Sequence, residues 1–148
     1  ALDALMRQLA ILMVADGEGA GRIARVVVRG GEEDRVEVAA RAVANSPLVK
    51  AALHGADPNW GRIVQAVGGA LGGGGLDGGH LLLDVFIEGI QVCSAGAAID
   101  YDEAALAEAV QGNEIEYEIT LAGDGAETEV FFSDLSHEYV RINAEYTT

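Results

Sequence analysis

Apolar side chains recur at helical spacing over residues 2–14, with polar side chains between them. The apolar positions share one helix face, and they are Leu2, Leu5, Met6, Leu9, Leu12 and Met13. Residues 22–29 instead form a run rich in β-branched side chains, which is typical of a strand. We therefore expect a helix and then a strand, separated by the glycine-rich residues 16–21.

Helix-start signals dominate the next forty residues. An apolar stripe predicts a helix over about residues 33–44. Ser46-Pro47 predicts a second helix, with the serine as cap, the proline at the first helical position and a stop at Gly55. The same order of residues in Asp57-Pro58 predicts a third helix, whose stripe is Ile63, Ala66, Val67 and Ala70.

Glycines fill most of residues 72–79, which predicts a surface loop. Two apolar runs follow at residues 81–87 and 90–95, and only Glu88-Gly89 separates them. A two-residue connection between runs of this kind predicts a β-hairpin.

The last third of the chain predicts one more helix and further strands. Asp100 and Glu103 form a possible capping box for a helix that ends near Gly112. Strict alternation over residues 114–121 predicts a strand with one exposed face. Residues 127–132 and 139–143 are expected to be strands as well.

This order of elements lacks regular alternation of strand and helix, so we expect a layered α+β fold. A domain boundary is predicted near Gly30-Gly31. Residues 1–30 are too few to form a core of their own and are expected to complete a larger sheet. Residues 31–148 are expected to form a small α+β domain.

The charge of the chain excludes some classes of partner. Of 148 residues, half are apolar, which is enough for a packed core. Acidic residues outnumber basic ones by 24 to 9, and the formal net charge is -15. Such a surface repels phosphate groups, so we expect no binding to nucleic acid or to anionic membranes. It suits a cationic small molecule or a basic protein.

The sequence shows neither a membrane-spanning segment nor a signal peptide, so we expect a cytoplasmic protein. Cys93 is the single cysteine, which rules out an internal disulfide, and its apolar neighbours predict a buried thiol. The histidines are too far apart in sequence to predict a metal site, and they are His54, His80 and His137.

Glu18 is the most interesting candidate for chemistry. Gly17 and Gly19 flank it, which leaves the carboxylate unshielded and allows another backbone to come close. Such a carboxylate could bind a ligand ammonium group, although an ordinary turn gives the same pattern. Residues 57–62 allow two interpretations as well: a capped helix start with a buried Trp60, or a helix N-terminus that faces an anion.

Three segments together resemble one enzyme family, the ornithine acetyltransferases, also called glutamate N-acetyltransferases. They are ADGEGAGR (15–22), SPLVKAALHGADPNWGRI (46–63) and SDLSHEYVRINAEYTT (133–148). Their order and spacing resemble the C-terminal part of the family's β chain. The second segment and the INAEYTT ending are the specific signals, whereas the DGEGA motif is weak when taken by itself.

The resemblance implies a precursor that cleaves itself before a threonine. That threonine becomes the β-chain N-terminus and the nucleophile, and it passes acetyl from N-acetylornithine to glutamate in a ping-pong reaction of arginine biosynthesis. The α chain supplies the oxyanion hole, and two α and two β chains form a heterotetramer. No cofactor is implied, although acetyl-CoA serves some members as acetyl donor. The implied fold is the layered α/β sandwich shared with self-cleaving N-terminal-nucleophile aminopeptidases.

Carried over by motif, the resemblance assigns substrate binding to Glu18, Asn143 and Thr148, with the C-terminal tail returning to the active site. No catalytic residue is assigned in this chain. Its threonines do not follow the family's alanine-threonine cleavage pattern, so the nucleophile is expected upstream of Ala1 and the 148 residues by themselves are expected to be inactive.

This sequence departs from the family pattern at two places. Gly21-Arg22 replaces the usual threonine-lysine, and Ser133 stands where cysteine is common. Two other functions stay open. A self-cleaving amidohydrolase shares the broad architecture of the family, and the missing nucleophile is also expected of a non-catalytic acidic domain for assembly or binding.

Overall fold

The computed structural model describes residues 2–72, 76–77 and 80–145. Its helices are α1 (Leu2–Ala15), α2 (Glu33–Asn45), α3 (Pro47–His54), α4 (Trp60–Leu71), α5 (Glu103–Ala109) and α6 (His137–Glu145). Its strands are β1 (Ile23–Arg29), β2 (Leu76–Asp77), β3 (His80–Leu81), β4 (Leu83–Ile87), β5 (Ile90–Ser94), β6 (Ala97–Ala98), β7 (Glu114–Leu121) and β8 (Glu127–Ser133). The mixture confirms the predicted α+β class.

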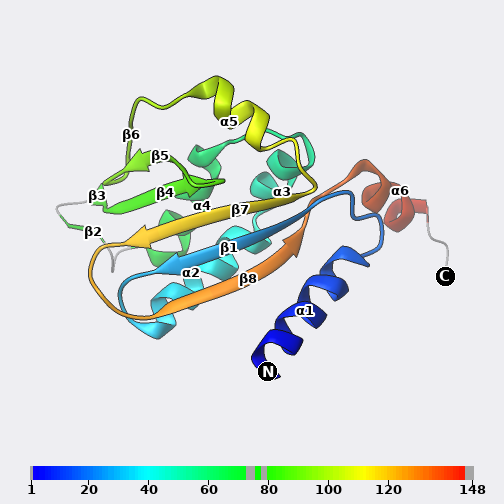
Figure 1. The fold of residues 1–148 in the computed structure, drawn as a ribbon, viewed down its shortest axis with the longest axis horizontal. Coiled ribbons are helices and arrows are strands. Elements are labelled where there is room, and N and C mark those ends of the chain that lie inside the picture. The colour runs from blue at the N-terminus through cyan, green and yellow to red at the C-terminus, as the bar shows by residue number, and fades with distance from the viewer. Residues whose placement is uncertain (1, 73–75, 78–79, 146–148) are drawn as a thin grey trace.

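Six strands form one sheet in the order β6-β5-β4-β7-β1-β8 (Figure 1). β1 is parallel to β7 and antiparallel to β8, so it separates two strands that are consecutive in the sequence. The sheet thus joins residues on both sides of the boundary predicted near Gly30-Gly31. The assignment of residues 1–30 to a separate, larger domain stays a prediction.

Helices α2, α3 and α4 lie against one face of this sheet, behind the strands in Figure 1. α2 contributes the predicted stripe of Val36, Ala39, Ala40 and Val43, all fully buried. Because two of these four side chains are alanines, the helix backbone can lie close to β1 and β8. The buried side chains of the strands and of α4 complete one continuous core.

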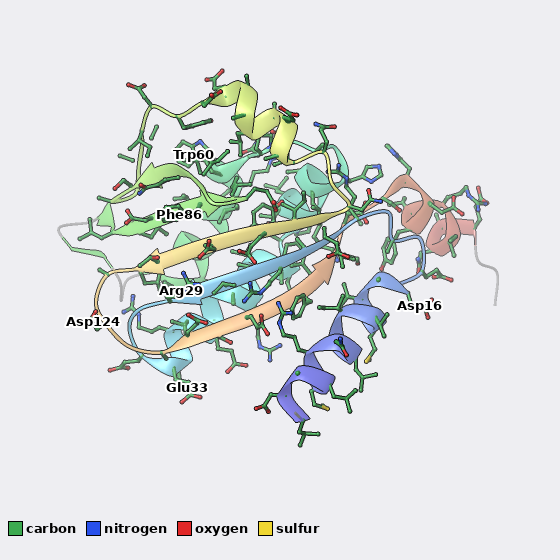
Figure 2. The ribbon with its side chains drawn as sticks, in the orientation of Figure 1. Asp16, Arg29, Glu33, Trp60, Phe86 and Asp124 are labelled. Atoms are coloured by element: carbon green, nitrogen blue, oxygen red, sulfur yellow. The ribbon has the colours of Figure 1, made fainter. Side chains whose placement is uncertain are left out.

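The opposite face of the sheet carries rows of ion pairs. Arg25 contacts Glu116 at 2.5 Å and Glu129 at 2.6 Å, so one guanidinium joins β1 to both neighbouring strands. Arg29, labelled in Figure 2, does the same with Glu118 and Glu127. The polar positions of the predicted alternation over residues 114–121 therefore lie on a charged face, and part of the chain's acidity is neutralised there.

Several local predictions are confirmed. Ser46 caps α3 by accepting a hydrogen bond from the Val49 amide, and Pro47 takes the first helical position. β4 and β5 form the predicted hairpin through Glu88-Gly89, whose φ angles of 51° and 74° are left-handed, as a tight two-residue turn requires. Cys93 is buried, and burial raises the pKa of its thiol.

Two helix starts differ from the predictions. α4 begins at Trp60, and Asn59 is its cap. The Asp57 side chain does not cap the helix, because its Oδ2 accepts a hydrogen bond from the Asn59 side-chain Nδ2 at 3.0 Å. α5 is capped by Asp102, whose Oδ1 accepts from the Ala105 amide at 2.9 Å, so the predicted pairing of Asp100 with Glu103 is wrong.

The predicted strand over residues 139–143 is wrong, because these residues belong to helix α6. Ser136 accepts a hydrogen bond from the Tyr139 amide at 2.9 Å and thereby starts the helix. Arg141 pairs with Glu138 and Glu145, three residues before it and four after it, which is the spacing of a helix surface. The cap and these pairs outweigh the strand preference of the β-branched side chains there.

Helix α1 turns its polar side towards the sheet and leaves its apolar side exposed. The side with Arg7 faces β8: its guanidinium lies 3.0 Å from Glu129 and 5.1 Å from the centre of the Phe131 ring. None of the α1 residues, all of which the structure describes, is buried. Its apolar face is left open, with Leu12 64% and Met13 76% exposed. No helix within the described residues is long and apolar enough to cross a membrane.

Candidate functional site

The segment that carries Glu18 lies beside α6, at the end of the sheet where β1 begins and β8 ends (Figure 1). Gly19 has φ of +70°, and a β-carbon on it would lie 2.5 Å from the Tyr139 nitrogen and 2.8 Å from the Tyr139 α-carbon. Only glycine fits such a contact. The close backbone approach expected from the glycines around Glu18 is therefore an approach to α6.

This packing brings two of the predicted substrate-binding residues together. Asn143 Nδ2 lies 3.5 Å from Glu18 Oε2 and donates a shorter bond, 2.9 Å, to the Tyr139 carbonyl oxygen. Both side chains are exposed. A contact of 3.5 Å is long for a hydrogen bond, so the carboxylate and the amide remain open to a ligand. A carboxylate beside an amide can hold an ammonium group and a neighbouring polar group of one small molecule.

Thr148 lies outside the described residues. The assignment of substrate binding to Glu18, Asn143 and Thr148 stays a prediction for all three.

Asp134 is a residue that the sequence did not single out. Its side chain is fully buried. Oδ1 accepts hydrogen bonds from the amides of Gly21 at 2.9 Å and Arg22 at 3.2 Å, and Oδ2 lies 2.7 Å from His54 Nδ1. This carboxylate holds the end of the Glu18 segment against β8 and α3.

Ser136 was missed for a different reason. Its hydroxyl donates to the Gly19 carbonyl oxygen at 2.5 Å and accepts from the Tyr139 amide at 2.9 Å. The sequence does carry a signal, because a serine cap followed by an acidic residue in the first turn of the helix, here Glu138, is typical of a helix start. The apparent strand pattern of residues 139–143 concealed it.

Two of the three histidines meet in the fold. The rings of His54 and His137 pack edge to face with centres 5.2 Å apart. In the part of the chain that the structure describes, no three histidine, cysteine or acidic side chains are grouped to hold a metal ion. The predicted absence of a metal site stays a prediction.

The 57–62 segment is explained by packing. Trp60 is half-buried against the core, and the Arg62 guanidinium donates to the Leu48 carbonyl oxygen at 2.8 Å. Arg22, a position that departs from the family pattern, donates to the carbonyl oxygens of Leu53 at 3.1 Å and Gln111 at 2.9 Å. The Arg62 bond joins α4 to α3, and the Arg22 bonds join the residue before β1 to α3 and to the turn after α5.

Comparison with known proteins gives one consistent family. A model described as the ArgJ family matches residues 1–148. The chain is 42% identical to the arginine biosynthesis bifunctional protein ArgJ of Deinococcus radiodurans, over 100% of this chain and 37% of the relative. It is 41% identical to the glutamate N-acetyltransferase of Methanocaldococcus jannaschii, over 100% of this chain and 38% of the relative.

A solved structure agrees with the sequence comparison. The crystal structure of the arginine biosynthesis bifunctional protein argJ from Bacillus halodurans superposes with a TM-score of 0.86 at 28% identity, covering 98% of this chain and 67% of that one. The chain spans less than two fifths of the length of the curated relatives named above.

Proposed function

The chain belongs to the ArgJ family, and we propose that it is part of an acetyltransferase that moves acetyl from N2-acetylornithine to glutamate in arginine biosynthesis. The observation that carries this proposal is the approach of Asn143 to Glu18 at 3.5 Å. Two segments far apart in the sequence, each resembling the family, thereby present a carboxylate and an amide to the same space.

In this proposal Glu18 binds an ammonium group of ornithine. A charge-assisted hydrogen bond is about twice as strong as a neutral one, so a cationic substrate gains most from this carboxylate. The Asn143 amide and Thr148 then bind the polar head of the same amino acid. The chain supplies these substrate contacts and not the attacking group.

The attacking group in the proposal is an N-terminal threonine outside these 148 residues. Its α-amine takes the hydroxyl proton, the oxygen bonds to the acetyl carbon, and the amide C–N bond breaks as ornithine leaves with a proton. Glutamate then attacks the ester with its amine, the ester C–O bond breaks, and threonine regains its proton. An α chain supplies the donors that stabilise each oxyanion. No cofactor takes part, and acetyl-CoA is an alternative acetyl donor.

The open apolar face of α1 supports the proposed assembly. Its large apolar side chains are about half to three quarters exposed, with values from 45% at Leu9 to 76% at Met13. A surface of this kind normally marks an interface. We place the α chain or the remaining β-chain residues on it, within a cytoplasmic heterotetramer of two α and two β chains that has the layered sandwich fold of self-cleaving N-terminal-nucleophile enzymes.

An acceptor-dependence assay tests this function. The protein expressed from its whole reading frame is incubated with N-acetylornithine, with and without glutamate. The proposal expects N-acetylglutamate, with ornithine release that depends on glutamate. Equal ornithine release without glutamate would instead establish the related amidohydrolase, and no turnover with either would favour the non-catalytic assembly or binding domain.

A further inference from the structure

We infer that Asp134 and Ser136 are positioning residues that hold Glu18 and Asn143 at the distance required for one ligand. The effect on substrate rests on the proposed function, whereas the structural link between the two segments does not. Both residues are nearly inaccessible, with 3% of Asp134 and 5% of Ser136 exposed. They therefore act through Glu18 and Asn143, which are exposed, and do not themselves touch the ligand.

Asp134 fixes the segment that follows Glu18. Its Oδ1 accepts hydrogen bonds from the backbone amides of Gly21 and Arg22, and its own backbone amide donates to the Arg22 carbonyl oxygen at 3.0 Å. Hydrogen bonds to a buried carboxylate are strong, because water does not compete for it. They come from backbone amides, so the link survives the exchange of the family's threonine-lysine for Gly21-Arg22.

Ser136 joins Gly19, the residue directly after Glu18, to the helix that carries Asn143. One hydroxyl donates to the Gly19 carbonyl oxygen and accepts from the first-turn amide of Tyr139. Asn143 lies one turn further along α6 and donates to the Tyr139 carbonyl oxygen. A continuous series of hydrogen bonds therefore leads from the residue after Glu18 to the Asn143 side chain.

Ser136→Ala, Ser136→Thr and Asp134→Asn test this inference in the protein expressed from its whole reading frame. Asp84→Asn is the matched control, because Asp84 Oδ1 also accepts a loop amide, that of Ala95 at 2.8 Å, outside the site. Hydrogen exchange followed by mass spectrometry reports on residues 16–22 and 137–145. We expect faster exchange in both segments for Ser136→Ala and in residues 16–22 for Asp134→Asn, recovery with Ser136→Thr, and no change there for Asp84→Asn.

Kinetics supply the second readout. Removing a buried hydrogen bond of this kind should raise KM for N-acetylornithine by about tenfold with kcat nearly unchanged. The reason is that the bound substrate and the transition state lose the same binding energy. Ser136→Thr should restore KM. If Ser136→Ala does not fold, Ser136→Cys, which keeps a weaker donor, takes its place.

The outcomes separate the two proposals. Unchanged exchange in both segments overturns the inference, as does faster exchange with an unchanged KM. If the parent protein transfers no acetyl group, the proposed function fails, and the exchange measurement alone then decides whether Asp134 and Ser136 hold the two segments together.

Discussion

Gly19 and Tyr139 are packed so closely that a β-carbon on residue 19 would lie 2.5 Å from the Tyr139 backbone nitrogen. The contact joins two segments that are 120 positions apart in the sequence. It sets the distance between the Glu18 segment and α6, on which the candidate site depends.

Gly19→Ala should therefore be strongly destabilising. Gly89→Ala is the matched control, since Gly89 has a similar φ of +74° but open space around its α-carbon. A left-handed alanine costs about 1–2 kcal/mol, so the control should lose that much free energy of unfolding. Gly19→Ala should lose clearly more, because α6 must also move. Equal losses in urea unfolding would show that the contact with α6 is not tight.

An alkaline loss of stability should depend on Tyr117. This side chain is buried, and burial is the main cause that raises the pKa of its phenol above the ordinary 10.0. Above pH 10 the Tyr117 phenol loses its proton in the unfolded chain and keeps it in the folded chain. The free energy of unfolding therefore has its full value below that pH and falls as the pH rises further.

Tyr117→Phe removes this proton and should flatten the decline in the free energy of unfolding between about pH 9.5 and 11. Tyr139→Phe, at an exposed position on α6, is the control and should decline like the parent protein. Parallel curves for the Tyr117 variant and the parent would contradict the prediction.

The open face of α1 should be needed for assembly and not for folding. Leu9 is 45% exposed, so Leu9→Glu should change the free energy of unfolding of these 148 residues by no more than about 0.5 kcal/mol. In the whole protein it should shift the mass measured by light scattering towards smaller species. Gln8→Glu adds the same charge on the opposite face and should leave the mass unchanged. An intact assembly with Leu9→Glu would place the interface elsewhere.

Much of the fold follows from local patterns. The stripe of α2, the Ser46-Pro47 start and the Glu88-Gly89 turn each depend on residues close in the sequence, and each is confirmed. The insertion of β1 between β7 and β8 depends on pairings between distant segments, which periodicity does not encode. The orientation of α1 also depends on distant segments, because its sequence pattern shows an apolar face without showing what covers it.

Part of the candidate site could likewise be predicted from local patterns and part could not. Glu18 was identified because glycines on both sides expose a carboxylate, and Asn143 through a family motif. Asp134 could not be identified, since a buried carboxylate is recognised only when its backbone partners from residues 21 and 22 are in place. Helix α6 is hard to predict because Val140 and Ile142 favour a strand, although Ser136 provides a helix cap.

The most direct test of the central claim is the steady-state kinetics of Glu18→Gln in the protein expressed from its whole reading frame. The glutamine keeps the size of the side chain and removes its charge. Asp124→Asn, in the turn between β7 and β8 (Figure 2), is the control. We predict a KM for N-acetylornithine raised by about tenfold or more for Glu18→Gln, with unchanged melting temperature, and parent values for the control. Equal kinetics for Glu18→Gln and the parent would contradict the account.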